Sequence, residues 1–353
     1  MSKNLLPEFS HQQTLFQPES PLPSVTKHIR VGSHRLTTTP VYDSYWLLAY
    51  ERQEILFKRL AGARAPWTQD PILRRHKFTN AYRAADRVSQ FLIKEVIYQS
   101  GLSSSIPEVF FRILLFKLFN KIDTWQLLTH TLGPITLASY CFEQYDNVLQ
   151  AALTAGEQIY SAAYMMPPGS TFFGYARKHQ NHLRLLEKMI AENLPQRIAD
   201  STSMADVFAL LRNYPTVGDF LAYQYTTDIN YSELTNFSEQ EFVVAGPGAK
   251  DGIRKCFQET AGLSDADLIR VVMDRQEQEF EVRNLPFRTL WGRPLQLIDC
   301  QNLFCEVSKY ARVRHPEIVG CSARTRIKQL FKPAFGDQLS YFFPPKWGLD
   351  TTQ

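Results

Sequence analysis

The sequence has few cysteines and no long apolar run, and both shortages narrow the kind of protein it can be. Its five cysteines among 353 residues form no C-x-x-C pair, so neither a zinc site nor an iron–sulfur loop has a matching spacing. No apolar run reaches the roughly 18 residues that span a bilayer, and the first residues lack the apolar stretch of a signal peptide. We therefore expect a protein of a reducing compartment, cytoplasmic or nuclear, with no metal, no cofactor and no membrane partner.

Strand-like alternation is also scarce, whereas apolar residues recur at helical spacing along most of the chain. This pattern predicts an all-α fold. Residues 1–41 read as an extended, proline-containing arm, 42–315 as a helical domain and 316–353 as a basic extension. The expected helices lie near 44–62, 79–99, 106–119, 121–131, 134–154, 175–193, 203–213, 216–229, 249–260, 264–282, 296–311 and 322–330.

The net charge of +4 is modest, but positive charge is concentrated in two stretches. Residues 51–95 hold ten Lys and Arg against five Asp and Glu, and residues 309–333 hold seven against one. Such patches suit a polyanion such as DNA, although solvated helix faces have the same composition.

A tight turn between two expected helices gives the first sign of function. The turn consists of Pro215, Thr216, Val217 and Gly218, and glycine at its end would allow a close approach that a Cβ hinders. The following helix would offer unpaired N–H groups to a phosphate. The alternative is an ordinary turn between two core helices.

This turn resembles the helix-hairpin-helix of the endonuclease III class of DNA glycosylases, since Pro215, Val217, Gly218 and Ala222 fall on its pattern. The resemblance implies a two-lobed helix-hairpin-helix fold of the glycosylase type. Phe220 stands where bifunctional members carry a Schiff-base lysine, so the resemblance implies a monofunctional enzyme.

Denser motifs lie on both sides of this turn. They include Tyr45-Trp46, the stretches Pro66–Leu73 and Lys77–Gln90, Gln224–Ser232, Val244–Ala249, Ile298–Asn302, Cys305-Glu306 and Lys309-Tyr310. Together they resemble, over about residues 42–315, the helical domain attached to phage 5-hydroxymethyl-dUMP DNA kinases. That domain is akin to the α-glutamyl/putrescinyl-thymine pyrophosphorylase-like family. The resemblance implies handling of hypermodified pyrimidines in DNA.

A kinase site is not expected, because no G-x-x-x-x-G-K-[ST] sequence occurs and Gly246-Pro247-Gly248 does not fit it. We therefore interpret the chain as the helical module alone.

Base excision requires a carboxylate that stabilises the sugar cation or activates water. Asp299, with Glu306 seven residues later on the same helical stripe, is the favoured pair, and helix capping is the alternative for Asp299. Asp251 and Asp228 are further candidates.

Contacts to DNA are expected from the turn residues Pro215–Gly218 and from Gly246, Gly248 and Lys250. Residues expected to line a base pocket or contact phosphate are Asn80, Arg83, Asp86, Arg87, Trp67 and Gln224. Asn80, Arg83, Asp86 and Arg87 would lie on adjacent turns of one helix. A structural Asp–Arg network is the alternative for this helix, and burial in the core is the alternative for Trp67.

Together these observations favour a monofunctional DNA glycosylase that flips modified pyrimidines out of double-stranded DNA, excises them and serves defence against phages. One alternative is a module that binds modified DNA without catalysis. Another is a transferase that hypermodifies hydroxymethyl-pyrimidines in DNA.

Overall fold

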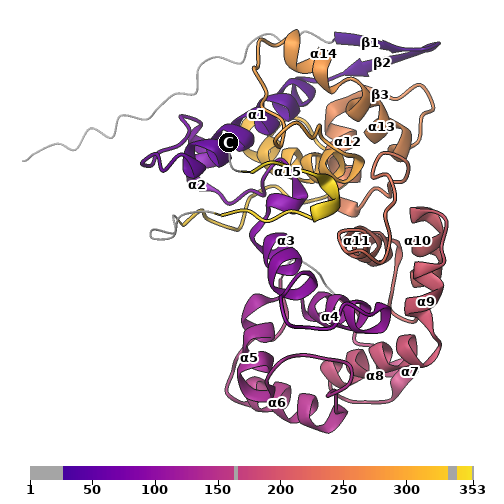
Figure 1. The fold of residues 1–353 in the computed structure, drawn as a ribbon. Helices are drawn as coiled ribbons and strands as arrows, with labels where there is room; N and C mark the ends of the chain where they lie inside the picture. Colours follow the sequence, from indigo (N-terminus) through magenta and orange to yellow (C-terminus); the bar gives the residue numbers. More distant parts are fainter. Residues whose placement is uncertain (1–26, 163–165, 333–339, 352–353) are drawn as a thin grey trace, which may run out of the picture.

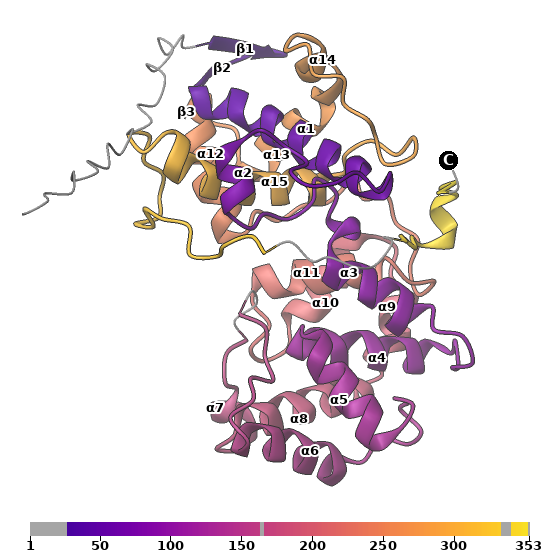
Figure 2. The ribbon, with the colours of Figure 1, turned by 90° about the vertical axis from the view of Figure 1, so that its left-hand side faces the viewer.

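The computed structural model describes residues 27–162, 166–332 and 340–351, and most of them lie in helices. Figures 1 and 2 show two lobes, one above the other, with α3 (Arg87–Phe91) and α11 (Asp219–Ile229) where they meet. The upper lobe contains residues from both sides of the chain's middle, and the lower lobe contains the middle itself. The expected boundaries at residues 41 and 315 stay a prediction.

The upper lobe is built around α15 (Leu297–Arg314), which packs against α1 (Pro40–Leu60), α12 (Pro247–Cys256) and α13 (Asp265–Asp274). The short helices α2 (Pro71–Arg75) and α14 (Gln276–Glu281) complete it. Helices α12 and α15 approach closely at Gly252, which has no Cβ. A Cβ there would lie 2.7 Å from the carbonyl carbon of Phe304. Most of α15 is buried, although it carries charged residues. Those charges need partners inside the protein.

A small antiparallel sheet covers one end of the upper lobe, in the order β1 (Lys27–Val31), β2 (His34–Thr38) and β3 (Phe257–Glu259). The all-α prediction is therefore right only for the bulk of the chain. Residues 27–38 of the expected arm form the β1–β2 hairpin, and residues 1–26 lie outside the described part. The helix expected to end at residue 260 stops at Cys256, where the backbone becomes extended and pairs with β2.

The lower lobe is centred on α4 (Ile106–Phe119), in which every residue from Val109 to Phe119 is buried. A helix that is buried on all sides lies in the middle of its domain. Asn120 then ends it with a left-handed φ of 49°. Around it lie α5 (Ile122–Leu132), α6 (Phe142–Thr154), α7 (Ser170–Phe173), α8 (Lys178–Ala191), α9 (Leu194–Ala199), α10 (Met204–Arg212) and α11.

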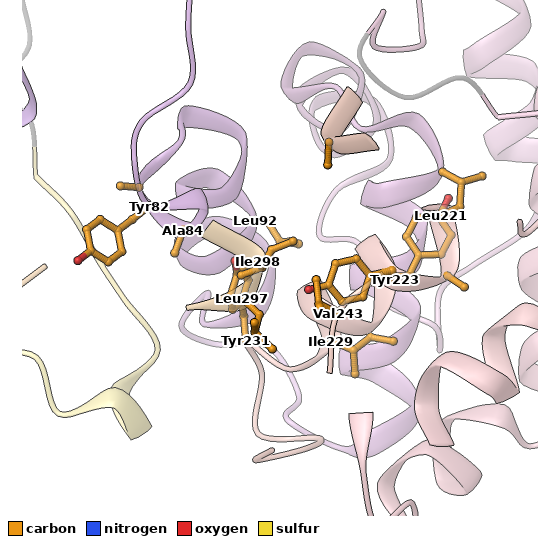
Figure 3. Close-up of a cluster of buried hydrophobic side chains, with 14 of the residues drawn as sticks. Tyr82, Ala84, Leu92, Leu221, Tyr223, Ile229, Tyr231, Val243, Leu297 and Ile298 are labelled. Atoms are coloured by element: carbon orange, nitrogen blue, oxygen red, sulfur yellow. The ribbon is translucent and has the colours of Figure 1, made fainter. Parts of the chain in front are cut away.

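An apolar cluster joins the two lobes. Figure 3 shows a row of its side chains, which begins at Tyr82 and Ala84 and continues through Leu92, Leu297, Ile298 and Tyr231. It ends at Leu221, Tyr223 and Ile229 of α11 and at Val243. All of these side chains are buried. The first turn of α15 is thereby fixed against α11 and the segment before α3, which are the elements that carry the motif residues.

The helix expected at 134–154 begins only at Phe142, and two other expected helices differ more from the prediction. Residues 79–86 are irregular apart from a short 3₁₀ turn, η1 (Arg83–Ala85), and helix begins only at α3, which continues into the π-helical turn η2 (Leu92–Ile97). Residues 322–330 form no helix, and His76 pairs with Leu330 in an isolated antiparallel bridge. In both places contacts with distant parts of the chain replace local helical hydrogen bonds.

Within the described residues, no helix combines the length and the apolar character that crossing a membrane requires.

Candidate functional site

A group of buried polar residues lies at the junction of the lobes, and we call it the Asp228 cluster. Asp228 is fully buried and forms ion pairs with Arg83 Nη1 at 2.8 Å and with Lys117 Nζ at 3.1 Å. Arg83 also donates from Nε to Gln224 Oε1 at 3.2 Å and from Nη1 to the hydroxyl of Tyr231 at 3.0 Å. The cluster therefore joins η1, α4 and α11, as the structural alternative for Arg83 anticipated.

The charge of Asp228 is stabilised by its two cations. Burial alone would raise the pKa of this carboxyl, but Arg83 and Lys117 outweigh burial and hold the pKa below its ordinary value. Asp228 is thus an anion at neutral pH that is already paired with two cations. Its predicted role in catalysis stays a prediction.

Asp299 lies at the first turn of α15 and has two backbone partners. One oxygen accepts from Gln296 N at 3.0 Å, which closes a capping box, and the other accepts from Arg83 N at 2.7 Å. Burial raises the pKa of Asp299 to about 7, and the charge of Glu239 adds to that rise. The capping alternative is therefore what the geometry supports directly.

Glu306 lies on the same buried stripe of α15, as the spacing of seven predicts. Its Oε2 accepts from Thr79 N at 3.0 Å and lies 2.7 Å from Lys309 Nζ. Asp299 and Glu306 thus both accept backbone N–H groups from residues 79–83, and together they hold that irregular segment against α15.

The prediction that Asn80, Arg83, Asp86 and Arg87 share one helix is wrong, and the hydrogen bonds of this segment explain why. Asp86 Oδ1 accepts from Asn80 N at 2.8 Å, and the Asn80 amide donates to Ala85 O at 2.7 Å. These local hydrogen bonds, together with those to Asp299 and Glu306, take the place of helical ones. Burial raises the pKa of Asp86 to about 7. Arg87 is exposed, unlike the other three residues.

Asp251 connects α12 to α15 and to the chain beyond it. It accepts from the hydroxyl of Ser308 and from Ser322 N, the latter at 2.7 Å, and pairs with Lys255 at 3.2 Å. The hydroxyl, the backbone N–H and the ammonium group that contact this carboxylate all belong to the protein itself. Its place is structural, and a catalytic role stays a prediction.

The turn between α10 and α11 forms where it was expected, but its details differ. Gly218 has a φ of −81°, and an added Cβ would meet nothing within 4 Å, so the expected steric need for glycine is wrong. Thr216 has the left-handed φ of 68° instead. Val217 is buried, and Asp219 places a negative charge in the first turn of α11, which disfavours phosphate there.

The glycines of the Gly246-Pro247-Gly248 turn serve packing. A Cβ on Gly246 would lie 2.9 Å from the ring of Phe220, and one on Gly248 would lie 2.9 Å from Cys305 Sγ. The turn brings the start of α12 against α11 and α15. Lys250 is exposed on α12. Contacts of these residues to DNA stay predictions.

Trp67 lies beyond the end of α1 that is far from the sheet. It lines a pocket of about 300 Å³. Its indole N–H donates to Ala63 O at 2.7 Å, and Arg59 lies 5.2 Å from the ring centre. Its stacking on a base stays a prediction.

A polar pocket of about 600 Å³ adjoins the Asp228 cluster, and sequence reasoning missed it. Its walls are residues 236–240, 291–294 and 346–349, together with Asn230 and Gln296. Glu239, 6% exposed, pairs with Arg293 Nη2 at 3.2 Å, and we call the space the Glu239 pocket. Burial raises the pKa of Glu239, against the opposing effect of Arg293. Glu239 was not among the predicted carboxylates, although it lies 21 residues after Gly218, far nearer than Asp299.

The pocket walls are fixed by contacts within the fold. Asn230 at the end of α11 accepts from Phe237 N at 3.0 Å and donates to Phe237 O at 3.0 Å, which shapes the turn before Glu239. Near the end of the chain, Lys346 in η3 (Pro345–Trp347) donates to Ser232 O at 2.6 Å and to Thr235 O at 2.5 Å.

Aromatic contacts connect the pocket to the Asp228 cluster. Trp347 packs edge-to-face on Tyr231 with 5.7 Å between ring centres, and the guanidinium of Arg293 lies 3.9 Å from the Trp347 ring centre. Tyr231 in turn accepts from Arg83. Residues 346–349 thus complete a site whose other parts lie in two earlier stretches of the chain, at residues 236–240 and 291–296.

Exposed cations lie on and after α2 and along residues 324–332, and we call this group the basic face. The segment after residue 325 runs beside α2, with Lys77 N donating to Gln329 O at 3.1 Å and Phe331 N donating to Arg75 O at 3.0 Å. None of its side chains forms an ion pair with a described residue. The face consists of Arg74, Arg75, Lys77, Arg324, Arg326, Lys328 and Lys332.

Among the described residues, no three His, Cys, Asp or Glu side chains are grouped as metal ligands would be.

Comparison with known proteins identifies the class of the chain. The model of the family described as "5-hmdU DNA kinase, helical domain" matches residues 39–320. The 5-hmdU DNA kinase of Bacillus phage SP10 is 26% identical over 305 residues, which cover 80% of this chain and 47% of that protein. The chain thus spans about half the length of this curated relative. No solved structure matches it.

These matches overturn the predicted function. Both names are those of a kinase, which transfers a phosphoryl group, so the prediction of a DNA glycosylase that hydrolyses N-glycosidic bonds is wrong. The transferase alternative agrees with them better. The resemblance to the kinase-attached helical domain is confirmed, and the chain belongs to the family of 5-hmdU DNA kinase helical domains.

Proposed function

We propose that this chain acts in the hypermodification of 5-hydroxymethyluracil in DNA, as a protein of the phosphotransferase class. The observation that carries the proposal is the family match over residues 39–320. In such a reaction the hydroxymethyl oxygen bonds to the γ-phosphorus of a nucleoside triphosphate, and the nucleoside diphosphate leaves. The proton of the hydroxymethyl group passes to a base.

The carboxyls at the lobe junction support this chemistry. Burial raises the pKa of Asp86 and of Asp299 to about 7 each, and it raises the pKa of Glu239. A carboxylate with a pKa near the working pH is the kind of group that accepts a proton efficiently at neutral pH. Glu239 is the one of these three carboxyls that lines the polar pocket, where a substrate could reach it.

The direct test is phosphoryl transfer to a defined DNA. We expect the chain, given γ-labelled ATP and Mg²⁺, to label a duplex that carries one 5-hydroxymethyluracil and to leave the same duplex with thymine unlabelled. Mass spectrometry of the digested DNA should show one added phosphate on the modified nucleoside. Absence of labelling with all four nucleoside triphosphates would overturn the transferase proposal.

A second candidate is a module that recognises the modified DNA for another protein. Two observations favour it, namely the coverage of only 47% of the relative and the absence of a G-x-x-x-x-G-K-[ST] sequence. This candidate predicts tighter binding to the 5-hydroxymethyluracil duplex than to the thymine duplex, with no transfer to either.

Both candidates require DNA binding, for which we propose the basic face. Reversing two of its charges, Arg326→Glu with Lys328→Glu, should weaken binding to every DNA sequence by roughly ten- to a hundredfold near physiological salt. It should also lower the slope of log affinity against log salt, because fewer counterions are released. The measurement is fluorescence anisotropy with labelled duplexes at several salt concentrations.

The matched control is Arg30→Glu with Arg35→Glu, two exposed cations that face each other across the β1–β2 hairpin. This variant changes the net charge equally. If both double variants weaken binding to the same extent, overall charge and not the basic face is responsible.

A further inference from the structure

The Glu239 pocket has the size and the lining of a site for a polar ring. About 600 Å³ is within the range of small-molecule sites and exceeds what one nucleoside needs. Amide side chains at its walls can both donate and accept, which suits the alternating donors and acceptors of a pyrimidine edge. They belong to Asn236 and Gln240.

The carboxylate in this pocket is costly for the fold. Glu239 is 6% exposed and its ion-pair partner is Arg293. A buried carboxylate has room for about four hydrogen bonds, and burial without enough donors is unfavourable. A ligand that donates from N–H or O–H would therefore bind more tightly here than one that offers only a methyl group.

The rim of the pocket holds a strained aromatic residue. Leu290 and Arg293 exchange backbone hydrogen bonds at 3.1 Å each, and the two residues between them have φ values of 47° at Trp291 and 90° at Gly292. Such turns favour Asn or Gly at both central positions, and a bulky residue with positive φ is an outlier. Strained residues of this kind cluster at ligand sites.

We infer that the Glu239 pocket receives a hydroxymethyl-pyrimidine nucleotide held outside the base stack, with Trp291 against the base and Glu239 accepting from the hydroxymethyl group. The inference rests on the proposed function for the identity of the base. Thymine lacks the hydroxyl donor and leaves the buried carboxylate without that hydrogen bond, which is how the pocket distinguishes the two bases.

The test compares two short single-stranded oligonucleotides that differ at one position, 5-hydroxymethyluracil or thymine. The ratio of their dissociation constants isolates recognition of the hydroxyl, since backbone contacts cancel. We expect the native chain to favour the modified oligonucleotide about tenfold. Glu239→Gln should reduce that ratio to about one, while the exposed neighbour Glu241→Gln leaves it unchanged.

A second variant covers the case that Glu239→Gln fails to fold. Trp291→Gly removes the ring and suits the positive φ, and it should weaken binding of both oligonucleotides about tenfold at an unchanged ratio. Circular dichroism checks the fold of each variant. A native ratio of one, or folded variants that bind both oligonucleotides as the native chain does, would overturn the inference.

These outcomes are separate from those of the labelling experiment. Discrimination that depends on Glu239 without phosphoryl transfer would reject the transferase proposal and leave the pocket assigned. Transfer that both variants leave unchanged would reject the pocket and leave the transferase proposal intact.

Discussion

Replacing Gly252 with alanine is expected to lower the free energy of unfolding by about 3 kcal/mol or more, and to leave little folded protein at 37 °C. The new Cβ would lie 2.7 Å from the carbonyl carbon and 3.1 Å from the Cα of Phe304. Both are backbone atoms, so no side-chain rotation relieves the overlap, and α12 would have to move away from α15. That movement would loosen the centre of the upper lobe.

Urea unfolding followed by circular dichroism measures this effect. Gly218→Ala is the matched control, since its φ of −81° suits alanine and its Cβ would meet no atom within 4 Å. Loss of the N-cap glycine there should cost less than about 1 kcal/mol. Equal destabilisation by the two substitutions would show that the close approach of α12 and α15 is not what Gly252 serves.

The second large effect is expected from Asp228→Asn, which should lower the free energy of unfolding by about 3–5 kcal/mol. Arg83 and Lys117 are 3% and 4% exposed, and both would lose the anion that they share. Breaking one partner of a buried ion cluster leaves uncompensated buried charge, which costs far more than the pair contributes in net stability.

Asp219→Asn is the matched control, because Asp219 pairs with Arg212 while the two side chains are 65% and 50% exposed. Exposed pairs of this kind contribute at most about 1 kcal/mol. If the two substitutions cost the same in thermal unfolding, burial does not determine the strength of the Asp228 cluster.

The pH dependence of the Asp228→Asn effect has a definite sign. The pKa of Asp228 is lower in the folded protein than its ordinary value near 3.8, so ionised Asp228 stabilises the fold. That contribution is fully present above the unfolded pKa and disappears as pH falls through the folded pKa. The difference in stability between the native chain and Asp228→Asn should therefore shrink below about pH 4.

Long amphipathic helices were predictable because their spacing is a local property. The pattern near 106–119 and 203–213 corresponds closely to α4 and α10. The prediction of helix at residues 79–86 was wrong because the structure there depends on distant residues. Two backbone N–H groups of this segment donate to Glu306 and Asp299, more than 200 residues away, and no short window of sequence contains both partners.

The candidate site was only partly predictable for the same reason. The motifs that suggested Asp228, Arg83, Asp299 and Glu306 mark residues that the fold does bring together. Their hydrogen-bond and ion-pair partners, however, are groups of the protein itself, and the sequence did not indicate those partners. The Glu239 pocket depends on Arg293 and on Lys346 near the end of the chain, and neither belongs to a motif. Only the folded chain places them beside Glu239.

The division of the upper lobe between residues 27–75 and 247–314 has a consequence for synthesis. Helix α1 emerges from the ribosome long before α12 and α15, so its apolar face must wait for nearly 200 further residues before its partners exist. The lower lobe, contiguous from α3 to α11, can close in that interval as domains do during translation. Its closure shortens the effective loop between the halves of the upper lobe, which lowers the entropic cost of joining them. Folding of the lower lobe thus brings the two halves of the upper lobe close to each other.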